Sequence, residues 1–96
     1  MRARLIYRRD ETRPDGVRVS MVIWQLPQAT AERAHALKYR LYAGREGNTL
    51  VRYDNEAGKG DHRHLGASER DVPYTFVSAE QLVIDFLADI EEQKNG

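Results

Sequence analysis

The sequence contains no cysteine. This absence excludes a disulfide framework, a thiolate metal site and a cysteine nucleophile, and it fits a reducing compartment. Long apolar runs are also missing. No stretch approaches the roughly 20 residues that cross a bilayer, and the basic start of the chain is not followed by the apolar segment of a signal peptide. We therefore expect a cytoplasmic protein that does not span a membrane.

An excess of one charge is missing as well. The 15 basic and 15 acidic residues give a formal net charge of zero, but they are unevenly distributed. Residues 1–70 carry 14 basic and 9 acidic side chains, a balance of +5, and residues 71–96 carry 1 and 6, a balance of −5. A cationic front part suits anionic partners, nucleic acid included. Strands that turn their arginines to water would give the same pattern.

Alternating apolar and polar residues predict four strands in a single domain, 1–96. The expected strands span residues 2–8, 17–26, 37–43 and 49–54. Hairpin turns are expected at 9–16 and 44–48, where proline, aspartate and glycine favour chain reversal. Residues 28–36 fit either a short helix or a loop, because Thr30 is a candidate N-cap that lacks the partner of a capping box.

A C-terminal helix is the clearest local signal. Ser78 can cap it and Gln81 completes a capping box. The apolar stripe at helical spacing consists of Leu82, Val83, Phe86, Leu87 and Ile90, and the residues expected toward water are Asp85, Asp89 and Glu92. Residues 65–75 are expected to be a connector. The predicted fold class is α+β, an antiparallel sheet of about four strands followed by a helix packed on one face.

The face of this sheet away from the helix is expected to be basic and aromatic. In the first strand, Leu5 and Tyr7 should share the inner face. The residues expected on the other face are Arg2, Arg4, Arg18, Lys38, Arg40, Tyr42 and Trp24. Such a surface suits RNA or a protein partner, because cations neutralise phosphates and flat rings stack on bases. Residues 27–36 would hide the two aromatic rings if they folded over them.

Residues 53–64 form a polar segment that carries the candidate functional residues. The segment reads Tyr-Asp-Asn-Glu-Ala-Gly-Lys-Gly-Asp-His-Arg-His and has no aliphatic side chain larger than alanine. Its glycines suit backbone conformations that other residues resist. We expect a functional loop held at the end of the fourth strand, where a sheet fixes the loop and the loop supplies reach.

Metal-independent RNA cleavage is one chemistry that this segment fits. Attack by the 2′-hydroxyl of RNA needs an acid, a base and cationic stabilisation of the phosphate. The candidate catalytic residues are His62 and His64 as acid and base, with Asp61, Asp54 and Tyr53 as orienting groups. The candidate substrate-binding residues are Lys59, Arg63, Asn55 and Arg40. If His62 and His64 lie on a strand, they point the same way. A solvated segment with structural hydrogen bonds is the competing interpretation.

Two further chemistries are weaker candidates. His62 and His64 with Asp54 and Asp61 offer nitrogen and oxygen ligands for zinc or manganese, but the neighbouring Lys59 and Arg63 oppose a second cation. Gly58-Lys59-Gly60 resembles part of a phosphate-binding loop, yet it lacks the Walker spacing and a following serine or threonine. We therefore expect no metal and no cofactor, and we assign no role to His35.

Several segments together resemble the TumE-type family of small toxins from prokaryotic toxin-antitoxin pairs. The segments that carry the resemblance are residues 1–7, 21–27, 38–40, 52–56, 58–64 and 74–76, with Leu82, Phe86 and Asp89 of the helix. The most specific of them are Tyr53-Asp54-Asn55 and Lys59-Gly60-Asp61-His62-Arg63-His64. The resemblance implies a toxin that acts on RNA or translation and that pairs with a small helix-turn-helix antitoxin.

We therefore expect a toxin-like endoribonuclease whose partners are RNA and a helix-turn-helix antitoxin. A non-enzymatic binding module for an antitoxin, nucleic acid or nucleotide is the alternative. A homodimer is a further expectation, because a strand left open at residues 2–8 or 49–54 can pair with a second copy.

Overall fold

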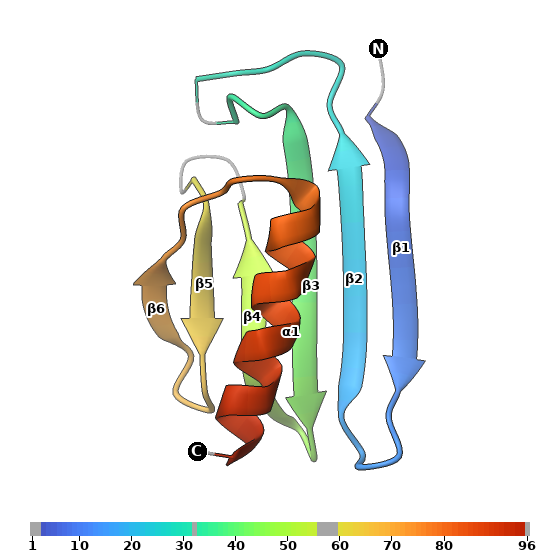
Figure 1. The fold of residues 1–96 in the computed structure, drawn as a ribbon, viewed down its shortest axis with the longest axis vertical. Coiled ribbons are helices and arrows are strands. Elements are labelled where there is room, and N and C mark those ends of the chain that lie inside the picture. Colours follow the sequence, from blue (N-terminus) through green and yellow to red (C-terminus); the bar gives the residue numbers. More distant parts are fainter. Residues whose placement is uncertain (1–2, 32, 56–59, 96) are drawn as a thin grey trace.

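Within residues 3–31, 33–55 and 60–95, which the computed structural model describes, the chain forms six strands and one helix (Figure 1). The elements are β1 (Arg4–Thr12), β2 (Arg18–Gln25), β3 (Leu37–Arg45), β4 (Asn48–Asp54), β5 (His62–Leu65), β6 (Arg70–Pro73) and α1 (Ala79–Asn95). Each strand pairs antiparallel with the next along the chain, in the order β1-β2-β3-β4-β5-β6. The α+β class with a C-terminal helix is confirmed, and the expected number of strands is too small by two.

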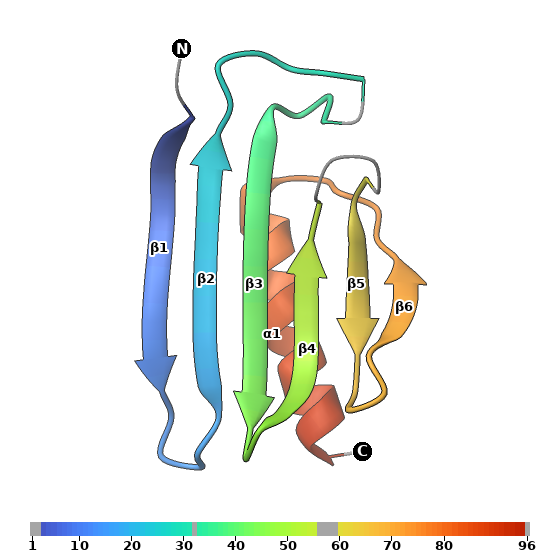
Figure 2. The same ribbon diagram turned by 180° about the vertical axis from the view of Figure 1, so that it is seen from behind.

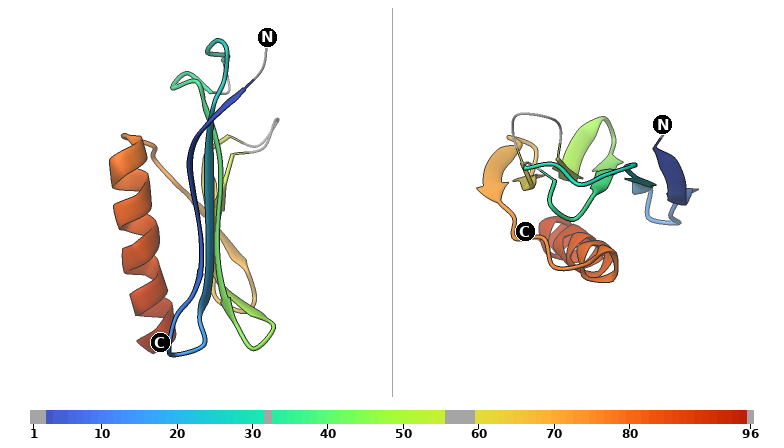
Figure 3. Two further views of the ribbon diagram at one scale, coloured as in Figure 1. Left: turned by 90° about the vertical axis from the view of Figure 1, so that its right-hand side faces the viewer. Right: turned by 90° about the horizontal axis from the view of Figure 1, so that it is seen from above.

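The molecule has two layers. The helix lies on one face of the sheet, where it packs against β4, and none of the described residues forms a helix on the opposite face (Figures 2 and 3). We call this second surface the open face. The helix of the described residues is not long and apolar enough to cross a membrane.

The core lies between the helix and alternate residues of β2, β3 and β4. Successive strand residues point to opposite faces, so every second residue faces the helix. The buried apolar residues are Val17, Val19, Met21, Ile23, Tyr39, Leu41, Ala43, Val51, Tyr53, Leu82, Phe86 and Ile90. The predicted strand alternation and helical stripe are thus confirmed for the central strands, and Leu82, Phe86 and Ile90 form the buried line of the helix.

The first strand departs from the prediction at Ile6. The register shifts there, so that Leu5 pairs with Trp24 and Tyr7 pairs with Ile23. A bulge of this kind inserts one residue and reverses the faces on one side of it. Leu5 therefore lies on the open face instead of sharing a face with Tyr7. The strand also runs on to Thr12, and the turn that follows is shorter than predicted.

The expectation of a connector at residues 65–75 was wrong. Leu65 ends β5, and residues 70–73 form β6. These strands have four residues each, which is too short for alternation to identify them. The strand at 49–54 is not open either, because β4 pairs with both β3 and β5. The edges of the described sheet are β1 and β6.

The predicted helix start is confirmed, but the predicted outer face of the helix is partly wrong. The Ser78 hydroxyl accepts a hydrogen bond of 3.1 Å from the Gln81 backbone N–H. Asp85 accepts a hydrogen bond from the Tyr74 hydroxyl, and Asp89 pairs with Arg63. Both carboxylates therefore face the sheet. In the described part of residues 26–36 the chain forms a loop and no helix.

Gly44 provides space that β3 needs. A Cβ atom at this position would collide with the hydroxyl of Tyr42 and would lie 2.9 Å from the carbonyl oxygen of Asn48. The phenol of Tyr42 thus runs along β3, over Gly44, on the open face. Both residues lie on the same side of the strand, because they are two positions apart.

We expect the Gly44→Ala substitution to lower the free energy of unfolding by about 1–3 kcal/mol, since the side chain and the backbone must both shift. Urea denaturation measures this loss. In a Tyr42→Ala background the loss should be smaller, because the phenol no longer fills the space. An equal loss in both backgrounds would show that the phenol is not the obstacle.

Candidate functional site

Strand pairing divides the polar segment between the two faces of the sheet. Asp54 pairs with His62 and Tyr53 pairs with Arg63, so these two pairs point to opposite sides. The side chains of Asp54 and His62 belong to the open face, whereas Tyr53 and Arg63 face the helix. The sequence brings these residue types together, but the pleat separates them.

The open face carries two adjacent rows of functional groups, which we call the open-face grid. Backbone pairing joins β3 to β4 and β4 to β5 in register. The first row is Arg40, Asp54 and His62, and the second row is Tyr42, Arg52 and His64. Neighbouring strands lie about 4.8 Å apart, so the side chains of each row are within reach of one small ligand.

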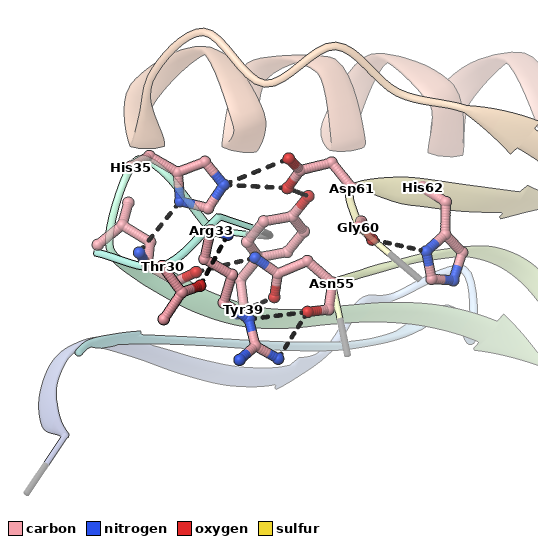
Figure 4. Close-up of polar contacts among 9 residues, drawn as sticks. Thr30, Arg33, His35, Tyr39, Asn55, Gly60, Asp61 and His62 are labelled. Atoms are coloured by element: carbon pink, nitrogen blue, oxygen red, sulfur yellow. Dashed lines mark hydrogen bonds and ion pairs between the residues drawn. The ribbon is translucent and has the colours of Figure 1, made fainter. Parts of the chain in front are cut away.

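His62 is held on both sides of its ring. Its Nε2 atom lies 2.9 Å from Oδ1 of Asp54. Its Nδ1 atom donates to the carbonyl oxygen of Gly60 at 3.0 Å (Figure 4). A carboxylate and a carbonyl oxygen both accept, so both contacts are satisfied when the ring carries two protons. His62 and Asp54 are also buried, at 7% and 4% exposure. This fixes the direction of the imidazole.

His64 stands beside His62 in a different setting. The two ring centroids lie 5.1 Å apart with an interplanar angle of 85°. The Nδ1 atom of His64 donates to the backbone carbonyl of Glu69 at 3.1 Å. This bond leaves the lone pair of the neutral ring on Nε2, which has no hydrogen-bond partner among the described residues. The shared face expected for two histidines on a strand is therefore present.

Two arginines complete the grid. The guanidinium of Arg52 lies 3.7 Å from Asp54 and 3.4 Å from Glu69. Both distances exceed the roughly 2.7–2.9 Å of a strong charge-assisted hydrogen bond, so the guanidinium can still bind an anion. Arg40 is exposed next to Asp54. Sequence reasoning missed Arg52, although its spacing of two from Asp54 places it on the same strand face.

A second cluster lies under the helix. Arg63 donates to Asp89 at 2.9 Å and to the Tyr53 hydroxyl at 3.2 Å, and the same hydroxyl donates to Asp89. Burial and the hydrogen bond to Asp89 raise the pKa of Tyr53 well above its usual range. Tyr74 packs on Tyr53 with ring centroids 5.0 Å apart. These contacts fasten the helix to β4 and β5, and neither Tyr53 nor Arg63 is part of the grid.

A third cluster lies at the end of the sheet (Figure 4). The Tyr39 hydroxyl donates to Asp61 at 2.6 Å, and Nε2 of His35 lies 3.1 Å from the same carboxylate oxygen. The Leu37 backbone N–H donates to Nδ1 of His35, which places the proton of the neutral ring on Nε2. Burial and the hydrogen bond to Asp61 raise the pKa of Tyr39. His35, to which sequence reasoning gave no role, therefore ties the 26–36 loop to the start of β5.

Asn55 clamps the end of β4 to the start of β3. Its amide nitrogen donates to the Leu37 carbonyl at 2.8 Å, and its amide oxygen accepts from the Tyr39 N–H at 3.1 Å. The Arg33 guanidinium donates twice to the Asn55 carbonyl, at 2.8 and 3.0 Å. The side chain is 1% exposed and its polar atoms are occupied. Figure 4 shows these contacts together.

The structure thus brings Asp54, His62, His64 and Arg40 together on the open face. Tyr53, Arg63 and Asn55 lie elsewhere. Asp61 borders the histidines, and its carboxylate is engaged by Tyr39 and His35. Lys59, the remaining candidate, lies outside the described residues. Among the residues described, no three His, Asp or Glu side chains are grouped so that they could hold a metal ion.

A family model described as toxin TumE matches residues 2–94. The chain belongs to the TumE family. The resemblance noted in the sequence is thereby confirmed over nearly the whole chain. The family name identifies a toxin component, and a toxin of this kind implies an antitoxin partner. No curated protein and no solved structure matches the chain.

We expect Asn55→Ala to destabilise this TumE-family chain strongly. The substitution leaves the Tyr39 N–H and the Leu37 carbonyl buried without partners, at about 1–3 kcal/mol for each group. Asn48→Ala, at the exposed first position of β4, should change the free energy of unfolding by less than about 0.5 kcal/mol. Urea denaturation compares the two variants. Wild-type stability of Asn55→Ala would contradict the clamp.

Alkaline conditions should weaken the cluster under the helix. The pKa of Tyr53 is raised above its unfolded value of 10.0, so its contribution to stability is complete below pH 10 and is lost as pH rises further. The Tyr53→Phe variant has no phenol to ionise after unfolding. Its free energy of unfolding should therefore fall less steeply than that of the wild type between about pH 10 and 11.5.

Urea denaturation at successive pH values measures both slopes. The Ser78→Ala variant is the control, because loss of the helix cap costs about 1 kcal/mol without changing any phenol. It should keep the wild-type slope. Identical slopes for Tyr53→Phe and the wild type would show that this phenol does not contribute to the pH dependence.

Proposed function

We propose that the protein is a toxin that cleaves RNA without a metal ion, in the cytoplasm, by attack of the 2′-hydroxyl on the adjacent phosphate. The observation that carries the proposal is the open-face grid. It places two imidazoles, each with a different hydrogen-bond environment, beside a carboxylate and two guanidinium groups. These are the acid, the base and the cations that the reaction requires.

His64 is the proposed base. Its Nδ1 proton is engaged by the Glu69 carbonyl, so Nε2 is the atom that can accept a proton from the 2′-hydroxyl. As the proton leaves, the 2′-oxygen forms a bond to phosphorus and the bond from phosphorus to the 5′-oxygen breaks. The products are a 2′,3′-cyclic phosphate and a 5′-hydroxyl.

His62 is the proposed acid, which gives a proton to the leaving 5′-oxygen. Its contacts with Asp54 and with the Gly60 carbonyl hold the ring beside His64. In this proposal the N–H that faces Asp54 turns to the leaving 5′-oxygen when RNA binds. Asp54 orients this ring. Arg40 and Arg52 would neutralise charge on the phosphate, and Lys59 stays a proposed phosphate ligand from the sequence. Tyr53, Arg63, Asn55 and Asp61 act in this proposal by fixing the strands that carry the grid.

A helix-turn-helix antitoxin is the partner that we propose from the family resemblance. A homodimer through β1 is also proposed, because β1 is an edge of the described sheet and its outer backbone groups can pair with another strand.

A non-enzymatic binding role is the second candidate function. A groove of about 470 Å³ between β1 and the helix favours it, since its lining is mostly apolar and includes Ile6, Tyr7, Ile23 and Ile84. Ile6 and Ile84 are 43% and 57% exposed. Exposed apolar surface of this kind is typical of protein interaction sites.

The test of cleavage uses the purified chain with RNA in excess chelator and maps the product ends. We expect cyclic phosphate ends and a loss of rate of about 100-fold or more in His64→Ala, because general acid-base groups contribute about 10²–10⁴. The control is Arg70→Ala, which changes an exposed residue of β6 outside the grid and should cleave at the wild-type rate.

The outcomes separate the candidates. Cleavage that survives in His64→Ala would exclude this histidine as the base. Cleavage that needs added manganese or zinc would exclude the metal-independent reaction. Intact RNA under every condition, combined with retained RNA or antitoxin binding, would favour the binding role.

A further inference from the structure

A depression lined in part by the two histidines extends beyond the groups that the proposed reaction uses. Its volume is about 530 Å³, and it is lined by Asp61, His62, His64, Asp71 and Pro73. This volume is within the range of roughly 300–1,000 Å³ that is typical of small-ligand sites. Backbone pairing places Asp71 beside His64 and Pro73 beside His62. β6 therefore extends both rows of the open-face grid by one residue.

We propose that this depression binds a guanine base, with Asp71 accepting hydrogen bonds from the edge of the base. The base belongs to the nucleotide whose 2′-hydroxyl faces His64. The inference rests on the proposed function, because it names the nucleotide that the same site prefers.

Asp71 is the acceptor that can contact a base. The carboxylates of Asp54 and Asp61 are engaged by His62 and by His35 with Tyr39, respectively. Asp71 is exposed at the rim and has no hydrogen bond or ion pair with any residue that the structure describes. A carboxylate accepts through two oxygens and donates nothing. The group that it pairs with best is one that offers two donors side by side.

Guanine is the base with such an edge, since its N1–H and its N2 amino group point in the same direction. Adenine and cytosine each offer one amino group beside a ring nitrogen that accepts, and this nitrogen would face a carboxylate oxygen unfavourably. Uracil offers a single N–H between two carbonyl oxygens. Donor and acceptor pattern alone therefore ranks guanine first for Asp71.

The position of Asp71 selects the nucleotide on the 5′ side of the cleaved bond. Asp71 and His64 are directly opposite on adjacent strands, where Cα atoms are about 4.5–5.5 Å apart. One nucleotide can thus present its 2′-hydroxyl to His64 and its base to Asp71. The ring of Pro73, exposed on the same rim, offers an apolar surface for the face of the base.

The first measurement maps the 3′ ends of products from an RNA with equal numbers of the four bases. We expect ends at guanosine to exceed ends at adenosine by roughly tenfold or more, as for a bidentate base contact. In Asp71→Asn one acceptor becomes a donor, so this ratio should fall by roughly tenfold. Glu92→Gln removes one negative charge from the exposed side of the helix and should keep both the rate and the ratio.

The second measurement needs no cleavage. Guanosine 3′-monophosphate and adenosine 3′-monophosphate are titrated into the full chain by calorimetry. We expect tighter binding of the guanosine nucleotide, and we expect Asp71→Asn to remove the difference. Thermal unfolding of each variant shows whether the chain is folded in these titrations.

The two measurements distinguish the inference from the proposed function. RNA cleavage without guanine preference, or a preference that Asp71→Asn leaves unchanged, overturns the guanine site alone. Selective binding of the guanosine nucleotide without any RNA cleavage supports the guanine site and overturns the nuclease. Neither cleavage nor nucleotide binding overturns both.

Discussion

The pairing of β4 with β5 is the constraint on which the candidate site depends. β5 has four residues, and a slip of one residue would turn His62 and His64 toward the helix and Arg63 toward the open face. A contact just beyond β5 opposes such a slip, because the Gly66 N–H donates to the Leu50 carbonyl at 2.8 Å. Asn55 fixes β4 on β3, so the strand with which β5 pairs is itself held in place. Backbone pairing therefore determines which side chains lie on the open face.

The helix supports the same register from the opposite face. Arg63 reaches Asp89 and Tyr53 only when β5 turns this side chain inward. A slipped strand would leave the Asp89 carboxylate, which is largely covered, without its cation, and an unpaired buried charge is costly. The ion pair under the helix and the imidazole pair on the open face thus require the same register, and a slipped strand would lose both. This explains why functional groups next to each other in the sequence serve on different faces.

Most of the fold follows from local patterns, and the site follows only in part. Period-two alternation identified the long strands, and Ser78 with Gln81 identified the helix start, because both signals depend on neighbouring residues. β5 and β6 are short and polar, so only their pairing with neighbouring strands identifies them as strands. His62 and His64 were predicted to share a face if they lay on a strand. Tertiary pairing decides the rest. It turns Tyr53 and Arg63 to the other face, and it brings His35 to Asp61, which is 26 positions away in the sequence.

The balance of charge at the grid indicates how it would recognise RNA. Arg40 and Arg52 stand close to Asp54 and Glu69, so two carboxylates offset the charge of the two cations. Affinity for the phosphates of RNA grows with the number of cations that neutralise them, so this affinity is limited at the grid. What the strands supply instead is fixed position. The imidazole of His62 is buried and held from two sides, and the bond from His64 to Glu69 directs its second nitrogen outward. Under the proposed function, groups fixed in this way would act on one phosphate at one place, and selectivity would then come from the base beside it.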